Sequence, residues 1–184
     1  MKTKSILFNT EMVRAILTHQ KTCTRRFAND KDKPYAAVGD LLWVKETSAI
    51  RPDSKIDFAI SYRANYSDNG NINTMPSVGM ERRSGTPEKT FPSKQFTING
   101  AMAWHPSLFM PRWASRITLE IEGMRKEPLQ DITEESARRE GFTDREAFKS
   151  LWIELYGQKS WDDNPNVWVI DFKTIFKNVD DIHK

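Results

Sequence analysis

One stretch of this 184-residue chain, residues 65–100, carries almost none of the apolar periodicity that builds a core. Asparagine, serine, glycine and proline dominate it, and the pairs Asn69-Gly70 and Asn99-Gly100 are strong turn signals. The core must therefore come from the segments on either side. We expect one domain, residues 1–184, with a loop-rich insertion at about 65–100. Such loops are typically lids or arms at a functional site, and a disordered insertion is the alternative.

The segment before the insertion predicts one helix and two strands. Thr10 is a suitable cap for a helix over about 11–20, since Val13, Ile16 and Leu17 fall on one face. A buried strand is expected at 41–44, after the turn pair Gly39-Asp40. A second strand is expected at 56–62, where apolar residues alternate.

The segment after the insertion predicts further strands and two helices. Order should return at 101–109, followed by a long strand over 112–123. A helix is expected at 131–140, ended by Gly141. A second helix should begin at the capping box of Thr143 and Glu146 and end at Gly157, before a closing strand at 167–172. This order of elements predicts an α+β fold with a mostly antiparallel sheet or a small barrel.

Composition excludes several classes of protein. No apolar run approaches the length of a membrane-spanning helix or of a signal-peptide core, so no membrane association is expected. The single Cys23 suits a reducing, cytoplasmic compartment. His19, His105 and His183 are scattered without a ligand spacing, and no glycine-rich phosphate loop is present. We therefore expect no metal and no cofactor, and the net charge of +3 only weakly favours anionic partners.

The densest polar cluster is Lys-Thr-Cys-Thr-Arg-Arg, residues 21–26. Composition alone fits a solvated helix end, where cations favour the helix dipole. The functional alternative is an anion-facing edge, with Arg25 and Arg26 for phosphate and Lys21 and Thr24 for chemistry. Lys21 and Thr24 share a face in a helix or turn but point to opposite faces in a strand.

A second cluster, residues 110–116, places tryptophan among arginines. The simplest interpretation is core packing with surface charge. Aromatic side chains interleaved with arginine also bind single-stranded RNA, by stacking on bases and holding phosphates. On that hypothesis Trp43 and Trp113 stack on a base, although each fits a core role better, and Arg112 and Arg116 hold phosphates.

Taken together, several segments resemble the ASCH domain of the PUA-like superfamily, and in particular the ASCH-like proteins of bacteriophages and prophages. The matching segments are Ile6–Phe8, Met12–Leu17, Lys21–Arg26, Gly39–Thr47, Pro106–Ile117, Leu129–Gly141 and Trp161–Phe172. They cover nearly the whole chain outside the insertion. The resemblance implies a PUA-like small β-barrel with flanking helices.

The bacterial N4-acetylcytidine amidohydrolases of the same superfamily carry a similar Lys-Thr-x-Thr motif after a helix. Their catalytic Lys, Thr and Glu match Lys21, Thr24 and Glu140 of this chain. This chain departs from them at His19-Gln20, where they have Gly-Arg, and in its insertion. The resemblance implies hydrolysis of an acylated nucleoside such as N4-acetylcytidine, with either Lys21 or Glu140 as the base that activates Thr24.

Three hypotheses therefore remain. The first is a Thr24/Lys21/Glu140 amidohydrolase. The second is a non-catalytic RNA-binding module in which Arg25, Arg26, Arg112 and Arg116 hold phosphates. The third is a ribonuclease that uses the same basic cleft. The expected partner is a modified nucleoside or RNA.

Overall fold

The structure, a computed structural model, describes residues 1–28, 34–52, 57–65, 81–84, 97–98, 101–102 and 104–182. Most of the predicted insertion at 65–100 lies outside these residues. Its role beside the site therefore stays a prediction.

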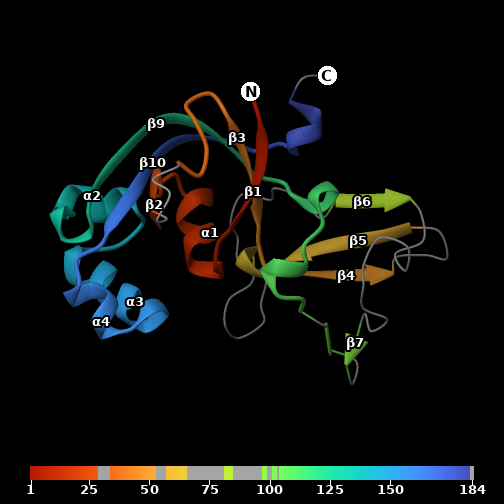
Figure 1. The fold of residues 1–184 in the computed structure, drawn as a ribbon. Coiled ribbons are helices and arrows are strands. Elements are labelled where there is room, and N and C mark those ends of the chain that lie inside the picture. The colour runs from red at the N-terminus through yellow and green to blue at the C-terminus, as the bar shows by residue number, and fades with distance from the viewer. Residues whose placement is uncertain are drawn as a thin grey trace.

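The centre of the molecule is a five-stranded mixed sheet with the strand order β1-β3-β9-β10-β2 (Figure 1). The strands are β1 (Thr3–Leu7), β2 (Cys23–Phe27), β3 (Leu41–Lys45), β9 (Thr118–Pro128) and β10 (Asn166–Ile175). β1 is parallel to β3, and the other neighbouring pairs are antiparallel. The described strands do not close into a barrel, because no backbone ladder joins the edge strands β1 and β2. The predicted α+β class is confirmed at this level.

α1 packs against the sheet, and most of the other elements lie at its two ends. Figure 1 shows α2, α3 and α4 gathered at one end and the strands β4 to β6 at the other. The helices are α1 (Thr10–Leu17), α2 (Glu134–Arg139), α3 (Arg145–Tyr156) and α4 (Gln158–Asp162). The smaller sheets contain β4 (Ser48–Pro52), β5 (Asp57–Tyr62) and β6 (Glu81–Ser84), and β7 (Thr97–Ile98) with β8 (Ala101–Met102). Short 3-10 turns include η3 (Ser107–Phe109), η4 (Arg112–Ala114) and η6 (Val179–Asp181).

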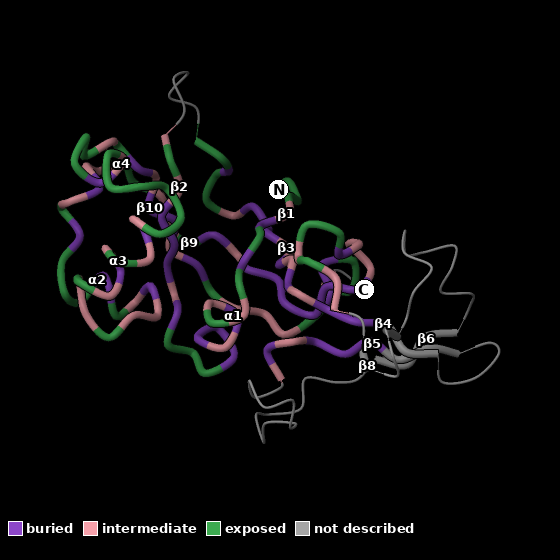
Figure 2. The backbone as a smooth tube through the Cα atoms, turned by 90° about the horizontal axis from the view of Figure 1, so that it is seen from below, coloured by how far each residue is buried: buried purple, intermediate pink, exposed green. Residues whose placement is uncertain are grey.

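Two apolar clusters cover opposite sides of β10. Ile170 belongs to the cluster that packs α1 against the sheet, whereas its neighbour Val169 belongs to the cluster beneath α2, α3 and α4. This is the alternation of a strand that is buried on both faces. Figure 2 shows buried backbone running along β9 and β10.

Helix boundaries follow from local capping. Asn9, rather than the predicted Thr10, caps α1, and its side chain accepts a hydrogen bond from the Met12 amide at 2.8 Å. The helix ends at Leu17 instead of residue 20, because His19 has a left-handed φ of 60°. Asp144, rather than Thr143, caps α3. The predicted stops at Gly141 and Gly157 are confirmed, with φ of 91° and 84°.

Two other segments differ from the sequence prediction. Residues Cys23–Phe27 form an edge strand instead of a helix end, because their backbone pairs with β10. The strand expected at 112–123 begins only at Thr118, since Pro111 precedes the η4 turn. The strands at 41–44 and 167–172 are confirmed, each slightly longer than expected.

None of the helices that the structure describes is long and apolar enough to cross a membrane.

Candidate functional site

Lys21 and Glu140, 119 residues apart in the chain, meet in a buried ion pair. Lys21 Nζ donates to Glu140 Oε2 at 2.8 Å and to the Glu140 backbone carbonyl at 2.9 Å. Lys21 is 0% exposed and Glu140 is 2% exposed. The turn after α1 positions the lysine, because the amides of Gln20 and Lys21 both donate to the Ala15 carbonyl. Glu140 is the C-cap residue of α2. Two of the three predicted catalytic side chains are therefore in direct contact.

Gly141 allows the end of α1 and the end of α2 to touch. It has a left-handed φ of 91°, which L side chains rarely adopt. A Cβ atom at this position would lie 2.7 Å from the Ala15 Cβ and 3.4 Å from the Lys21 Cβ. The ion pair can form at this distance only because residue 141 has no side chain.

Arg25 is a second cation on Glu140. Arg25 Nη1 donates to Glu140 Oε1 at 3.1 Å, while its Nη2 donates to Glu127 at 2.6 Å and to the Ser136 hydroxyl at 2.8 Å. Both oxygens of Glu140 thus accept hydrogen bonds from cations, which is the pattern of an ionised carboxylate. The Arg25 Nε is buried without a partner.

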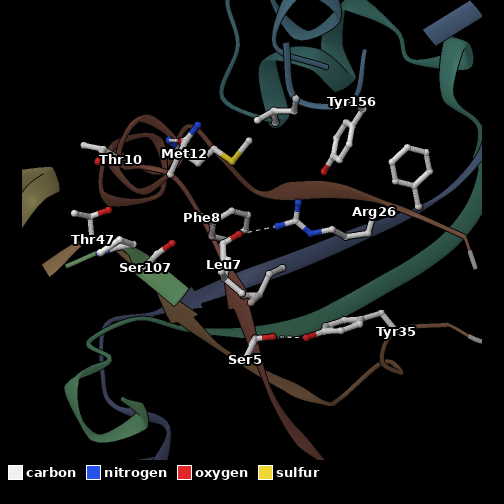
Figure 3. Close-up of a pocket in the computed structure, with 15 residues that line it drawn as sticks. Ser5, Leu7, Phe8, Thr10, Met12, Arg26, Tyr35, Thr47, Ser107 and Tyr156 are labelled. Atoms are coloured by element: carbon white, nitrogen blue, oxygen red, sulfur yellow. Dashed lines mark hydrogen bonds between the residues drawn. The ribbon is translucent and has the colours of Figure 1, made fainter. Parts of the chain in front are cut away.

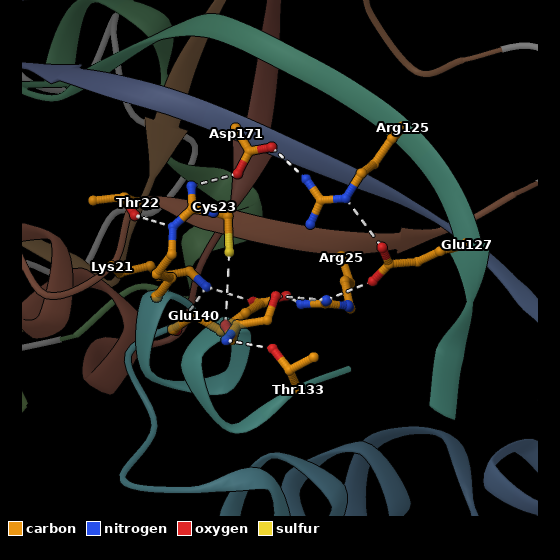
Figure 4. A network of polar contacts seen from close by, with 11 residues as sticks. Lys21, Thr22, Cys23, Arg25, Arg125, Glu127, Thr133, Glu140 and Asp171 are labelled. Carbon is orange, nitrogen blue, oxygen red and sulfur yellow. Dashed lines mark hydrogen bonds and ion pairs between the residues drawn. The ribbon is translucent and has the colours of Figure 1, made fainter. Parts of the chain in front are cut away.

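The contacts of Arg25 continue into a larger ion-pair network (Figure 4). Glu127 also binds Arg125 at 3.0 Å, and Arg125 binds Asp171 at 2.6 Å. Asp171 binds Arg139 at 2.5 Å. The network joins β2, β9, β10 and α2, so it fixes the position of Glu140 from several elements. The sequence did not predict the network residues Arg125, Glu127, Arg139 and Asp171. Arg125, Glu127 and Asp171 carry only the alternation of strands β9 and β10, and Arg139 resembles an ordinary basic residue at a helix end.

Cys23 lies inside this network, with its thiol toward the Ser136 carbonyl. Burial, and then the negative charge of Glu140, raise the pKa of Cys23 to about 12. The thiol is therefore neutral at physiological pH, where it is neither a nucleophile nor a thiolate ligand. Among the residues that the structure describes, no group of three His, Cys, Asp or Glu could hold a metal ion.

Thr24 lies in the middle of β2, opposite Ile170 of β10. It is 1% exposed and borders a small hollow of ≈ 30 Å³, together with Met12 and Phe142. A hollow of this size holds about one water molecule. The Thr24 hydroxyl makes no hydrogen bond to Lys21, Glu140 or any other described residue. Glu140 borders a neighbouring hollow of ≈ 180 Å³, which Met12, Phe142 and Leu151 also line.

A much larger cleft, of ≈ 670 Å³, lies beside Thr24 between β1, β2 and α3 (Figure 3). Its volume is in the range of small-molecule sites. Four side chains line both this cleft and the hollow at Thr24, and so separate the two: Met12, Arg26, Leu155 and Tyr156. Arg26 Nη2 donates to the Leu7 carbonyl at 2.9 Å, and its guanidinium lies 5.3 Å from the Phe8 ring centroid. Sequence analysis identified Arg26 but missed the tyrosines and Met12.

The structure does not bring the other predicted binding residues to this cleft. Arg116 is 2% exposed and forms a two-point ion pair with Glu46, at 2.8 and 2.9 Å, so it does not face a nucleic acid. Arg25 is likewise buried, by Glu140 and Glu127. Both guanidinium groups are buried and paired with carboxylates, and neither lines the cleft, so their role as phosphate ligands stays a prediction.

Arg112, Trp113 and Trp43 also lie outside the cleft lining. Arg112 is half-buried and pairs with Asp180 at 2.7 Å. Trp113 packs against the small cluster around Tyr62 and Met110. Trp43 lies on β3 with the Lys45 ammonium 5.6 Å from its ring centroid. The two tryptophans are half-buried, which fits the core role better than base stacking.

No family model matches the chain, and comparisons with curated proteins and with solved structures gave no match either.

Proposed function

We propose that this chain is an ASCH-type domain that hydrolyses the amide of an acylated nucleoside such as N4-acetylcytidine, using Thr24, Lys21 and Glu140. The observation that carries the proposal is the buried contact of 2.8 Å between Lys21 and Glu140. The two residues match the catalytic Lys and Glu of the N4-acetylcytidine amidohydrolases that the sequence resembles. An active site of that type requires these two side chains to meet, and the cleft of ≈ 670 Å³ lies beside the third residue, Thr24.

A PUA-like barrel is part of this proposal. Arg26 of β2 reaches the Leu7 carbonyl of β1, so a side chain bridges the two edge strands of the sheet. A sheet whose edges approach each other in this way is close to a closed barrel.

The proposed reaction has two steps. The Thr24 oxygen bonds to the acetyl carbonyl carbon, the bond from that carbon to N4 breaks, and the hydroxyl proton passes through a base to N4. Water then cleaves the ester, which releases acetate and restores the hydroxyl. Lys21 keeps one N–H beyond the two that Glu140 receives, and this donor suits the developing oxyanion.

The assignment of the base follows from the same contacts. Glu140 accepts from Lys21 and Arg25, which favours its role as an anchor for the lysine or as the base itself, with Lys21 as the oxyanion donor. Thr24 is buried, so the substrate must displace side chains that separate it from the cleft. Met12, Leu155 and Tyr156 are suited to this, because Met12 is flexible and the other two are largely exposed.

The second candidate is a non-catalytic binding module for a nucleotide or RNA. It is favoured by the exposed aromatic side chains and Arg26 in the cleft. The ribonuclease hypothesis has no comparable support, since Arg25 and Arg116 are enclosed by carboxylates.

Incubation of the protein with N4-acetylcytidine, followed by chromatography, tests the proposal. We expect release of cytidine and acetate, and loss of that release in Thr24→Val, which has nearly the same shape but no hydroxyl. Thr22→Val is the matched control, because Thr22 lies two residues away and contacts Arg139 instead. Absence of turnover on acylated nucleosides, together with tight nucleotide binding, would favour the binding module.

A further inference from the structure

The exposed apolar side chains of this protein gather around the large cleft. Among the described residues, five of the large apolar side chains that are exposed line it: Leu7, Phe27, Tyr35, Leu155 and Tyr156. Exposed apolar groups concentrated around one cavity mark a ligand site rather than a random surface. This cleft is distinct from the buried Lys21–Glu140 contact, since neither residue lines it.

Three aromatic rings form a contiguous cluster on one wall of the cleft. The ring centroids of Phe27 and Trp152 lie 4.9 Å apart, those of Phe27 and Tyr156 4.9 Å, and those of Trp152 and Tyr156 4.6 Å. Phe27 and Tyr156 are each 43% exposed, so the cluster presents ring surface to the cleft. Trp152 packs against both rings. Because the planes of Phe27 and Tyr156 are nearly perpendicular, at 86°, a flat aromatic ligand can stack on the face of one ring and meet the other edge-on.

Arg26 gives the cleft a positive charge. Arg26 is the only charged residue among its described lining residues, and it forms no ion pair with a described carboxylate. Its hydrogen bond to Leu7 uses one of five N–H groups. Figure 3 shows Arg26 extending between Tyr156 and Tyr35. Burial raises the pKa of Tyr35, and the positive charge of Arg26 acts against that rise. A guanidinium in an aromatic cleft, with no carboxylate partner in the described part of the chain, suits a phosphate.

The free edge of β1 argues against a peptide as the occupant. Its outward carbonyls, those of Ser5 and Leu7, already accept hydrogen bonds from the Tyr35 hydroxyl and from Arg26. An added peptide strand would have to displace both side chains.

We propose that this cleft binds an aromatic base that carries a phosphate, with the base on Phe27 and Tyr156 and the phosphate on Arg26. This inference rests on the proposed function, because the cleft adjoins the proposed nucleophile Thr24. It specifies that the substrate is a nucleotide rather than a free nucleoside. The same chemistry comes from a free mononucleotide or from a single strand of RNA.

Isothermal titration of the full chain with cytidine, cytidine monophosphate and a short oligocytidine RNA tests this proposal without any turnover. At low salt we expect the monophosphate to bind at least tenfold more tightly than cytidine. Arg26→Gln should remove this preference, and Arg26→Lys should keep part of it, because lysine retains the charge but not the two-point geometry. Arg112→Gln is the control, since Arg112 lies outside the cleft and should leave the preference unchanged.

Tyr156→Ala should weaken binding of all three ligands by about tenfold, because it removes stacking rather than charge.

A much higher affinity for the oligomer than for the monophosphate would identify a strand as the source, and equal affinity would identify the free nucleotide. Equal binding of cytidine and its monophosphate, or a preference that survives in a folded Arg26→Gln, would overturn the proposal. An inactive protein that still prefers the monophosphate would contradict only the amidohydrolase function.

Discussion

Glu46 and Glu140 are both almost completely buried, and both accept hydrogen bonds from cationic side chains. Glu46 is matched by a single partner, Arg116, whose guanidinium also lies 4.0 Å from the Tyr62 ring centroid. Glu140 is shared between Lys21 and Arg25, and it borders a hollow. The Glu46 carboxylate is enclosed by Arg116, whereas the Glu140 carboxylate joins Lys21 and Arg25 at the edge of the hollow.

We propose that this difference separates an ion pair that supports the fold from one that takes part in catalysis. Buried ion pairs add little net stability, because desolvation offsets the attraction between the charges. The Arg116–Glu46 pair ties the segment between η4 and β9 to the β3–β4 connection, and neither residue lines any of the three cavities described above. Lys21 keeps an N–H that Glu140 does not receive, and Glu140 borders the hollow of ≈ 180 Å³, which shares Met12, Phe142 and Leu151 with the hollow at Thr24. The comparison therefore predicts that disrupting the first pair changes stability and disrupting the second changes function.

The largest expected effect is on stability, in Glu46→Ala. The substitution leaves the Arg116 guanidinium buried without a counter-charge, which should cost about 3–5 kcal/mol of unfolding free energy. Chemical denaturation measures this cost. Arg112→Ala is the control, since its pair with Asp180 is partly exposed and should contribute about 0–1 kcal/mol. Equal losses in the two variants would show that burial does not distinguish these arginines.

Gly141→Ala should be more harmful than Gly157→Ala. Both glycines have a left-handed φ, so alanine at either position introduces backbone strain of about 1–3 kcal/mol. Only at Gly141 does the new Cβ collide, with Ala15 and Lys21, which should add about 1–3 kcal/mol. Thermal or chemical unfolding measures both costs. Ala15→Gly added to Gly141→Ala should restore part of the loss, and no rescue would mean that this contact does not set the distance between the two helix ends.

A pH dependence that involves Cys23 should be absent near neutral pH and grow as the pH rises above 9. Its pKa is raised from 9.0 to about 12 in the folded protein, so the unfolded chain ionises first as pH rises. Stability from this group is therefore fully present below pH 9 and is lost between pH 9 and 12, at up to about 1.4 kcal/mol per pH unit. The wild type should lose stability above pH 9 more steeply than Cys23→Ala. Glu140→Gln should reduce that difference, because the charge of Glu140 contributes to the shift. Parallel pH profiles for wild type and Cys23→Ala would contradict this account.

The sequence predicted the helices and the later strands where apolar periodicity and caps agreed. It placed Gly141 and Gly157 at helix ends, and the strand at 167–172, from purely local signals. The helix end predicted at residues 21–26 is wrong for Cys23–Phe27, which form an edge strand. The polar composition of this strand resembles that of a solvated helix end. Pairing with β10, a long-range contact, decides that structure.

The candidate site was predicted only in part, again because contacts between distant segments of the chain decide its structure. Resemblance brought Lys21 and Glu140 together, and the structure places them in contact. Arg25 and Arg116 look like available cations in the sequence, but carboxylates from distant segments enclose them. The cleft itself was not predictable, since Tyr35 and Tyr156 come from segments that meet only in the folded chain.

Turnover of N4-acetylcytidine per folded molecule, compared between Glu140→Gln and Glu46→Gln, tests the central claim most directly. The account predicts that Glu140→Gln loses a hundredfold or more of the turnover while remaining folded, because the shape of the site is retained and its charge is removed. Glu46→Gln should lose stability but keep the turnover of its folded fraction. Loss of turnover in both variants in proportion to the unfolded fraction, or full turnover in Glu140→Gln, would contradict a catalytic role for the Lys21–Glu140 pair.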